Sequence, residues 1–165
     1  MLKKIIIGML ALGVSATLFA AEQNILKKTR WRSVTNAKNS IVDMVGNEFH
    51  CVNNGKGSEG VFYVEYCKPP RQGKMIFSAE SKAEGIPAGA KLASQGQYSI
   101  FIDLAYQDGT RKFGIIKPFT YANHDWEKVS GEFDLPKPVA RINYHLLFRN
   151  AQGKVSFRNP VLMIK

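Results

Sequence analysis

The eleven residues QYSIFIDLAYQ, from Gln97 to Gln107, decide the fold class. Large apolar side chains occupy every second position, and side chains two residues apart point to the same face of an extended strand. The alternation therefore predicts a β-strand with one face in a hydrophobic core, formed by Tyr98, Ile100, Ile102, Leu104 and Tyr106. Asp108-Gly109 is a turn signal, so residues 111–116 are expected to return beside this strand as a hairpin.

The same alternation recurs in residues 139–150 and indicates a second half-buried strand. Its expected core face consists of Ala140, Ile142, Tyr144, Leu146 and Phe148, and its opposite face of Arg141, Asn143, His145, Leu147 and Arg149.

Short runs rich in β-branched and aromatic residues, separated by turns that contain Gly or Pro, predict further strands. They cover residues 49–52, 60–67, 74–81, 126–133 and 155–164, and Pro69-Pro70 is expected to end the second of them. Helical periodicity is weak throughout. About eight or nine strands at intervals of roughly ten to fifteen residues predict an all-β fold, an antiparallel β-sandwich or jelly roll.

Residues 1–21 have the pattern of a secretory signal peptide. Two lysines precede an apolar run over residues 5–12, and small alanines follow, the last at Ala20 and Ala21. The run is too short to span a bilayer comfortably, which disfavours a retained anchor. We therefore expect cleavage near Ala21, a secreted or periplasmic protein, and a single β-sandwich domain over residues 22–165.

The chain is strongly basic. Its formal net charge is +10, and it stays at +8 after Lys3 and Lys4 leave with the signal peptide. Such a charge favours acidic partners, such as an anionic glycan or nucleic acid, although a general solubility charge explains it equally well. Basic residues surround Trp31, but no nucleic-acid-binding fold signature accompanies them, so nucleic acid is not the expected partner.

Cys51 and Cys67 are the only cysteines. Export to an oxidising compartment makes a disulfide between them the default expectation. The predicted strands at 49–52 and 60–67 would form a hairpin with one cysteine on each strand. A bond there would stabilise the fold by about 3 kcal/mol in the chain-entropy model. A zinc pair is disfavoured because the spacing matches no recognised zinc motif.

Six segments in a fixed order resemble the carbohydrate-binding modules of the galactose-binding-like jelly-roll superfamily. They are FSAESKAE (77–84), YSIFIDLAYQDG (98–109), PFT (118–120), HDW (124–126), LLFR (146–149) and GKVSF (153–157). The resemblance extends from about Trp31 to the end of the chain. Modules of that family are usually appended to secreted polysaccharide-degrading enzymes, so the resemblance implies a non-catalytic domain that binds carbohydrate.

The last strand departs from the family pattern. Many members have an acidic residue after the aromatic residue there, and it often helps to bind a structural calcium ion. In this chain Phe157 is followed by Arg158, whose guanidinium cannot ligate calcium. Asn159 stays open as a calcium ligand, and no other cofactor is expected.

The stretch HDWEKV, from His124 to Val129, combines residue types found in active sites. The resemblance instead implies that Trp126 packs into the sandwich before a strand. Asp125 would then be a turn residue that satisfies backbone amides, and His124 would end a loop. This interpretation makes the stretch a corner of the fold.

Motifs of catalysis are missing from the sequence. It lacks Gly-x-Ser-x-Gly, His-Glu-x-x-His and Gly-rich phosphate loops, and its three histidines lie in distant segments. Ser81, Asp103 and His145 could meet in space, as such triples do in many β-sandwiches. We expect a protein that is not an enzyme, and keep a small hydrolase as an alternative.

Ligand-binding candidates lie on the polar faces of the two alternating strands and in one loop. Arginine forks and amides suit sugar hydroxyls, carboxylates or sulfates, and an exposed ring suits the apolar face of a pyranose. The candidates are Tyr121, Arg141, Asn143, His145, Arg149 and Asp103, with Trp31, Tyr63 and Tyr66 as further rings. An ordinary solvated sheet face also explains Arg141 and Asn143, and an ion pair with Asp103 also explains Arg149. A protein partner bound by the same fold is the alternative to carbohydrate.

Overall fold

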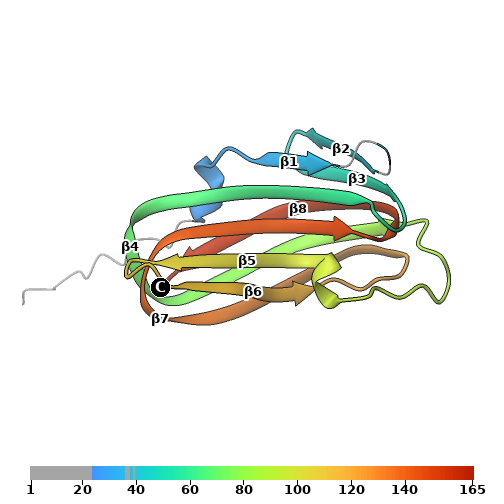
Figure 1. The fold of residues 1–165 in the computed structure, drawn as a ribbon. Helices are drawn as coiled ribbons and strands as arrows, with labels where there is room; N and C mark the ends of the chain where they lie inside the picture. Colours follow the sequence, from blue (N-terminus) through green and yellow to red (C-terminus); the bar gives the residue numbers. More distant parts are fainter. Residues whose placement is uncertain (1–23, 36–37, 39) are drawn as a thin grey trace, which may run out of the picture.

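Two strands of 26 residues each, β4 (Glu59–Glu84) and β7 (His124–Arg149), run side by side through the whole fold (Figure 1). The computed structural model describes residues 24–35, 38 and 40–165, so the predicted signal peptide lies outside the described residues. Both long strands bend at the same level, where the pairing shifts register on either side of Arg71. The bend carries each strand from one layer of a β-sandwich into the other.

The first layer contains β1 (Arg32–Thr35), the first half of β4, the second half of β7, β5 (Tyr98–Tyr106) and β6 (Arg111–Pro118). Neighbouring strands in it are antiparallel. The second layer contains β2 (Ser40–Val45), β3 (Glu48–Asn54), β8 (Gln152–Ile164), the second half of β4 and the first half of β7. The predicted jelly-roll sandwich is confirmed.

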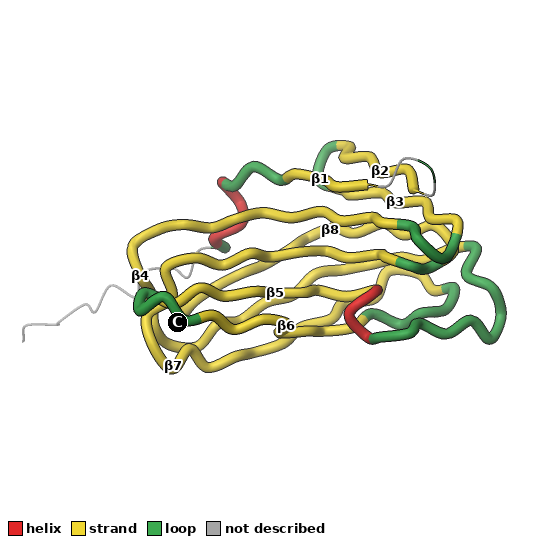
Figure 2. The backbone as a smooth tube through the Cα atoms, viewed as in Figure 1, coloured by secondary structure: helices red, strands yellow, loops and turns green. Residues whose placement is uncertain are grey.

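Two short 3-10 helices complete the part of the fold that the structure describes, η1 (Ile25–Lys28) and η2 (Gln95–Gln97). The longest loop leads into η2 and lies at the end of the sandwich opposite the bend of β4 and β7 (Figure 2). Within the described part of the chain, no helix has the length and apolar character needed to cross a membrane.

The core lies between the layers and is built from the alternating faces predicted from the sequence. On β5 the expected core residues are at most 7% exposed, and on β7 all of them but Ala140 are buried. The largest fully buried side chains are Tyr98, Tyr144, Phe62, Phe148, Phe157, Met75, Ile100, Ile102, Leu104, Ile142, Leu146 and Leu162.

Pro69-Pro70 does not end a strand, contrary to the prediction. The backbone continues through it as the bend of β4, and the strands predicted at 60–67 and 74–81 are the two halves of β4. Proline removes a ladder hydrogen bond and favours such irregular points. The strands predicted at 126–133 and 139–150 are joined in the same way into β7, at a segment that contains Pro136 and Pro138.

The predicted disulfide is wrong, and so is the hairpin on which it rested. β3 pairs with β2 and β8, whereas the first half of β4 pairs with β1 and β7. Both cysteines are free: Cys51 is buried against Gly60, and Cys67 is exposed. Cys67 lies seven residues beyond Gly60 on β4, about 23 Å at the rise of an extended strand. That distance is too long for a disulfide.

Candidate functional site

A groove of about 610 Å³ lies on the outer face of the first layer. Strands β1, β4, β7, β5 and β6 all contribute to it, and the loop at η2 closes one end. Its central lining residues are Tyr63, Phe101, Asp103, His145, Leu147 and Arg149. These residues alternate with the buried core residues of the same strands, so the groove occupies the face that points away from the core.

The strand register places four of the side chains in one row across the sheet. Tyr63 is opposite His145, His145 is opposite Phe101, and Phe101 is opposite Ile116. Directly opposite residues in antiparallel strands share a face and contact one another. The ring of Tyr63 stacks on the imidazole of His145 with centroids 6.1 Å apart, and Phe101 approaches that imidazole edge-on at 6.0 Å.

His145 presents a hydrogen-bond acceptor to the groove. Its Nδ1 lies 3.1 Å from the carbonyl oxygen of Phe101, and a carbonyl only accepts, so Nδ1 carries the proton. The other ring nitrogen, Nε2, is then an acceptor in the neutral imidazole. Burial lowers the pKa of His145 below its ordinary value, and the neutral form is therefore favoured at pH 7.

Asp103 is held in place by an irregularity in β6. Its Oδ1 accepts a 3.0 Å hydrogen bond from the backbone N–H of Gly114, between two register positions of β5 and β6. Gly114 has a φ of +69°, a conformation that glycine adopts without strain. No hydrogen bond among the described residues is recorded for the second carboxylate oxygen of Asp103, which is available for a ligand.

The ion pair between Arg149 and Asp103 that the sequence left open does not form, and the arginines of this face have other partners. Arg149 pairs with Glu59 at 2.8 Å rather than with Asp103, and Arg141 lies 3.5 Å from Glu65. All four carry side chains that are between 37% and 48% exposed, so each pair is open to solvent. Such pairs contribute little to stability and can be rearranged by a ligand.

The loop at η2 forms the closed end of the groove through Ser94, Gly96 and Gln97. The side-chain oxygen of Gln97 accepts hydrogen bonds from the backbone N–H groups of Ala93 at 2.8 Å and Ser94 at 3.3 Å. This capping arrangement fixes the loop against the sheet, because it satisfies backbone donors that the short helix leaves open.

Most of the predicted ligand-binding residues lie on this face. His145, Arg149 and Asp103 line the groove, and Asn143 and Arg141 follow on β7, opposite Asp103 and Ala105 of β5. Tyr63 and Phe101 complete the row. The sequence signal for both was an aromatic residue at a position that alternates with core residues.

Tyr121 lies elsewhere, and the prediction of an exposed ring is wrong. Its ring packs against Tyr98 and Phe148, with centroid distances of 6.5 and 6.4 Å. Its hydroxyl bonds to the backbone of Gln152, donating to the carbonyl oxygen at 3.2 Å and accepting from the N–H at 3.0 Å. Tyr121 therefore anchors a loop to β8.

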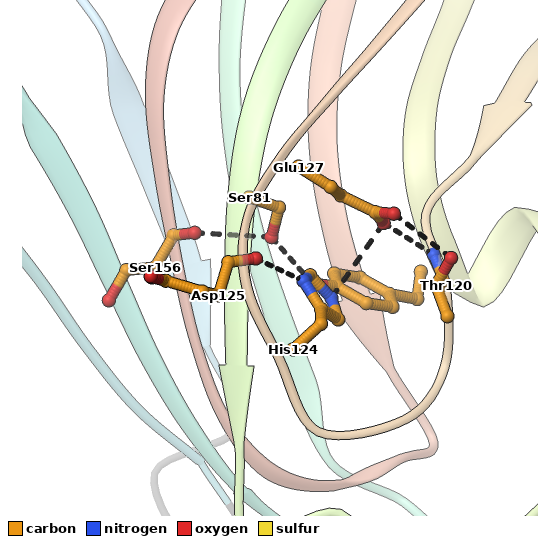
Figure 3. Close-up of polar contacts among 7 residues, drawn as sticks. Ser81, Thr120, His124, Asp125, Glu127 and Ser156 are labelled. Carbon is orange, nitrogen blue, oxygen red and sulfur yellow. Dashed lines mark hydrogen bonds and ion pairs between the residues drawn. The ribbon is translucent and has the colours of Figure 1, made fainter.

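The stretch that begins at His124 starts β7 directly after a loop, as expected for a corner of the sandwich, and Figure 3 shows its polar contacts. His124 opens β7, and its Nε2 lies 3.3 Å from the hydroxyl of Tyr98, which bonds in turn to Ser81. Glu127 accepts hydrogen bonds from both the N–H and the hydroxyl of Thr120, at 2.6 and 2.9 Å. Because Ser81 and Tyr98 are fully buried, their hydrogen bonds tie the start of β7 to the core.

Two details of this corner differ from the prediction. The carboxylate of Asp125 lies 3.7 Å from Nζ of Lys82, rather than capping backbone amides. Trp126 is half-buried, and its ring lies under the guanidinium of Arg158 at 3.8 Å. The triple of Ser81, Asp103 and His145 is not assembled either, because Ser81 is in the core while the other two face the groove.

The surroundings of Asn159 do not fit a calcium ion. Its side-chain amide donates to Glu80 at 3.1 Å, and Arg158 donates to the other oxygen of Glu80 at 2.7 Å. These bonds lower the pKa of Glu80, with the bond from Arg158 as the main cause. A cation is thus already bound to the carboxylate, and no group of three His, Cys, Asp or Glu side chains in the described ranges could hold a metal.

Comparisons with known proteins bear on the fold. No protein-family model matches the sequence, and no curated protein matches it either. Solved structures match in fold. The chain has the fold of carbohydrate-binding modules. One structure, titled "CBM4 structure and function", aligns with a TM-score of 0.52 at 11% identity, over 81% of this chain and 78% of the other.

Two further structures align equally well. BiXyn10A CBM1 in its apo form aligns with a TM-score of 0.52 at 8% identity, and the alignment covers 87% of this chain and 96% of that one. The CBM22-1–GH10 modules of a Clostridium thermocellum xylanase, complexed with xylohexaose, have a TM-score of 0.52 at 13% identity. That alignment covers 82% of this chain but only 26% of the xylanase chain. At these identities the likeness establishes the fold.

Proposed function

We propose that this protein binds a poly- or oligosaccharide in the groove on the first layer. The observation that carries the proposal is the row of Tyr63, His145 and Phe101 in an open groove that crosses the sheet. Flat rings pack against the apolar faces of pyranose rings, and ligand sites are typically concave with a few placed polar groups.

Polar groups beside the rings suit sugar hydroxyls. Nε2 of His145 and the second oxygen of Asp103 accept hydrogen bonds, and the guanidinium of Arg149 donates them. A hydroxyl both donates and accepts, so a sugar can satisfy acceptors and donors that lie side by side. The groove therefore combines stacking surface with directional polar contacts.

The fold supports the same function, because the solved structures of similar shape include carbohydrate-binding modules that match over most of their own length. We propose that the protein is not an enzyme. In support, Ser81 is buried away from Asp103 and His145, and among the described residues that line the groove Ser94 of the η2 loop is the only serine or cysteine, with no recorded contact to a base. A small hydrolase is the less favoured reading of the same face.

We also propose export to the periplasm or the medium, on the strength of the signal-peptide pattern in residues 1–21. The N-terminal sequence of protein recovered from a cell fraction tests this directly. A mature N-terminus near Glu22 in the exported fraction supports it, and an intact Met1 in the cytosolic fraction contradicts it.

A protein partner is the second candidate function, and one observation favours it. Among the described residues β2 pairs only with β3, and its side chains Ile41 and Val45 are 70% and 59% exposed. An edge strand with exposed apolar side chains can pair with another chain. Cross-linking and pull-down in the presence of added sugars would recover a complex whose formation is unaffected by those sugars.

A glycan array probed with wild-type protein at two salt concentrations tests the main proposal. Phe101→Ala is the matched groove variant, and Tyr121→Phe is the control because Tyr121 lies outside the groove. We expect specific glycan binding that survives high salt, weakens in Phe101→Ala and persists in Tyr121→Phe. No binding at either salt, or binding unaffected by Phe101→Ala, would overturn the proposal.

A further inference from the structure

Two arginines face each other across a small residue beside the groove. Ala105 of β5 is opposite Arg141 of β7 on one side and opposite Arg111 of β6 on the other. The three side chains share the face of the groove, because opposite residues of antiparallel strands point the same way. Strands lie about 4.8 Å apart, so the two arginine Cα atoms are roughly 10 Å apart with only a methyl group between them.

Arg111 and Arg141 are neutralised less by nearby carboxylates than Arg149 is. Arg149 is held by Glu59 at 2.8 Å, whereas Arg141 lies 3.5 Å from Glu65, in a longer ion pair that is open to solvent. Arg111 is exposed, and no ion pair with a described residue is recorded for it. Its strand, RKFGIIKP, has no acidic residue.

Neighbouring cations add to the field at this point. Lys112 and Lys117 of the edge strand β6 are both exposed, but they lie opposite the core residues Leu104 and Ile100 and so are on the other face of β6 from Arg111. Arginine forks bind carboxylate and sulfate groups through paired hydrogen bonds, which lysine does not do. The place where an anion is best bound is therefore between the two arginines, with the lysines contributing attraction at longer range.

Asp103 limits where on the face an anion can bind. It lies two residues from Ala105 on β5, about 7 Å away, between the arginine pair and the row of rings. Its carboxylate would repel an anionic group placed over the centre of the groove. A polysaccharide with an acidic sugar at every position is thus disfavoured. A neutral polysaccharide with one acidic group bound at the side of the groove is not.

We infer that the ligand is a largely neutral polysaccharide with isolated carboxylate or sulfate groups, one of which binds between Arg111 and Arg141. The inference rests on the proposed carbohydrate-binding function and adds the chemical class of the ligand. It also explains how a basic protein can use a groove whose centre contains the carboxylate of Asp103.

Three polysaccharides test it, with binding measured by affinity electrophoresis or surface plasmon resonance at one fixed low salt concentration. Glucuronoxylan carries isolated carboxylates on a neutral chain, its carboxyl-reduced form carries none, and polygalacturonate carries one on every residue. Wild-type protein is expected to bind glucuronoxylan most tightly and polygalacturonate most weakly. General attraction by net charge predicts the opposite order for these two.

Arg111→Gln is expected to reduce the preference for glucuronoxylan over its reduced form about tenfold, and Arg111→Lys to restore it only in part. Lys154→Gln is the matched control, since Lys154 is exposed on β8 in the other layer. Equal loss in the control, or tightest binding to polygalacturonate, overturns the inference. Binding of both xylans alike, or of none of the three while the glycan array gives signal, overturns it too. An array without signal overturns the proposed function itself.

Discussion

The ring of Tyr63 stacks on the imidazole of His145 at a centroid distance of 6.1 Å and an interplanar angle of 28°. The two residues are 82 positions apart in the sequence and meet because β4 and β7 pair along their whole length. The hydrogen bond from Nδ1 of His145 to the carbonyl oxygen of Phe101 fixes the orientation of the imidazole. The central part of the candidate site is thus rigid before any ligand arrives, which reduces the entropic cost of binding.

Acidification is expected to weaken glycan binding. Protonation of His145 turns Nε2 from an acceptor into a donor, so a sugar hydroxyl loses the acceptor that we assign to it. Because burial lowers the pKa of His145, affinity should stay constant from pH 8 to about 6.5 and fall only below that. Calorimetric titration across this range tests the prediction, and His145→Gln should show a flatter profile. A fall that persists unchanged in the variant would contradict it.

The stability of the protein should respond to the same group. The pKa of His145 is lower in the folded protein than in the unfolded chain. As the pH falls below about 6.5, the unfolded chain therefore binds more protons at this residue than the folded protein does, and unfolding becomes easier. The free energy of unfolding from urea titrations should therefore decline with acidification in wild-type protein. In His145→Gln the decline should be shallower, and equal slopes in both proteins would refute this origin.

Thiol reactivity should separate the two cysteines. Cys67 is exposed, whereas burial raises the pKa of Cys51 to about 12 and closes it to reagents. Without any reductant, the native protein should react with one equivalent of a thiol reagent and the guanidinium-unfolded protein with two. Mass spectrometry of the labelled peptides identifies the residues. An unfolded protein with no reactive thiol would show that a disulfide does form.

Gly60→Ala should destabilise the fold by about 1–3 kcal/mol, because a methyl group there would overlap Sγ of Cys51 in a well-packed core. Cys51→Ala removes that sulfur, so the double variant should be more stable than the sum of the two single effects predicts. Urea titrations of the four proteins give the coupling. Strict additivity would mean that the two residues do not meet.

Arg158 should stabilise the protein where a calcium ion would otherwise be expected. Arg158→Ala removes both the bond to Glu80 and the stacking on Trp126, and a loss of about 1–2 kcal/mol is expected. Lys128→Ala is the control, since Lys128 lies opposite Glu80 on β7 and is exposed. EDTA should leave the melting temperature of the wild type unchanged, and a fall of several degrees would contradict this account.

Sequence patterns predicted the strands best where a face is buried. Tyr98 to Tyr106 alternate so strictly that only one face can enter the core, and the structure buries that face. The local sequence around Pro69-Pro70 predicted the end of a strand. The strand continues through a bend instead, because β4 pairs with β7 on both sides of the two prolines. Local rules describe one segment, and the continuity of β4 depends on another segment far along the chain.

The same limit applies to the candidate site. The alternation of polar and apolar residues was enough to place Arg149, His145 and Asp103 on the face away from the core. The row formed by Tyr63, His145 and Phe101 depends on the register between three strands, which the alternation does not contain. The cysteine prediction failed because Cys51 and Cys67 belong to strands of different layers. The prediction of an exposed Tyr121 ring failed because its loop folds back onto β8, which no property of the loop sequence indicates.

The most direct test of the account is a nuclear magnetic resonance titration with the best oligosaccharide found on the glycan array. Binding in the groove predicts that the largest shift changes map to Tyr63, Phe101 and His145, and that Trp126 and Lys128 at the other layer stay unchanged. Shift changes centred on Trp126 and Lys128, or spread evenly over the basic surface, would contradict the central claim that the row of rings is the binding site.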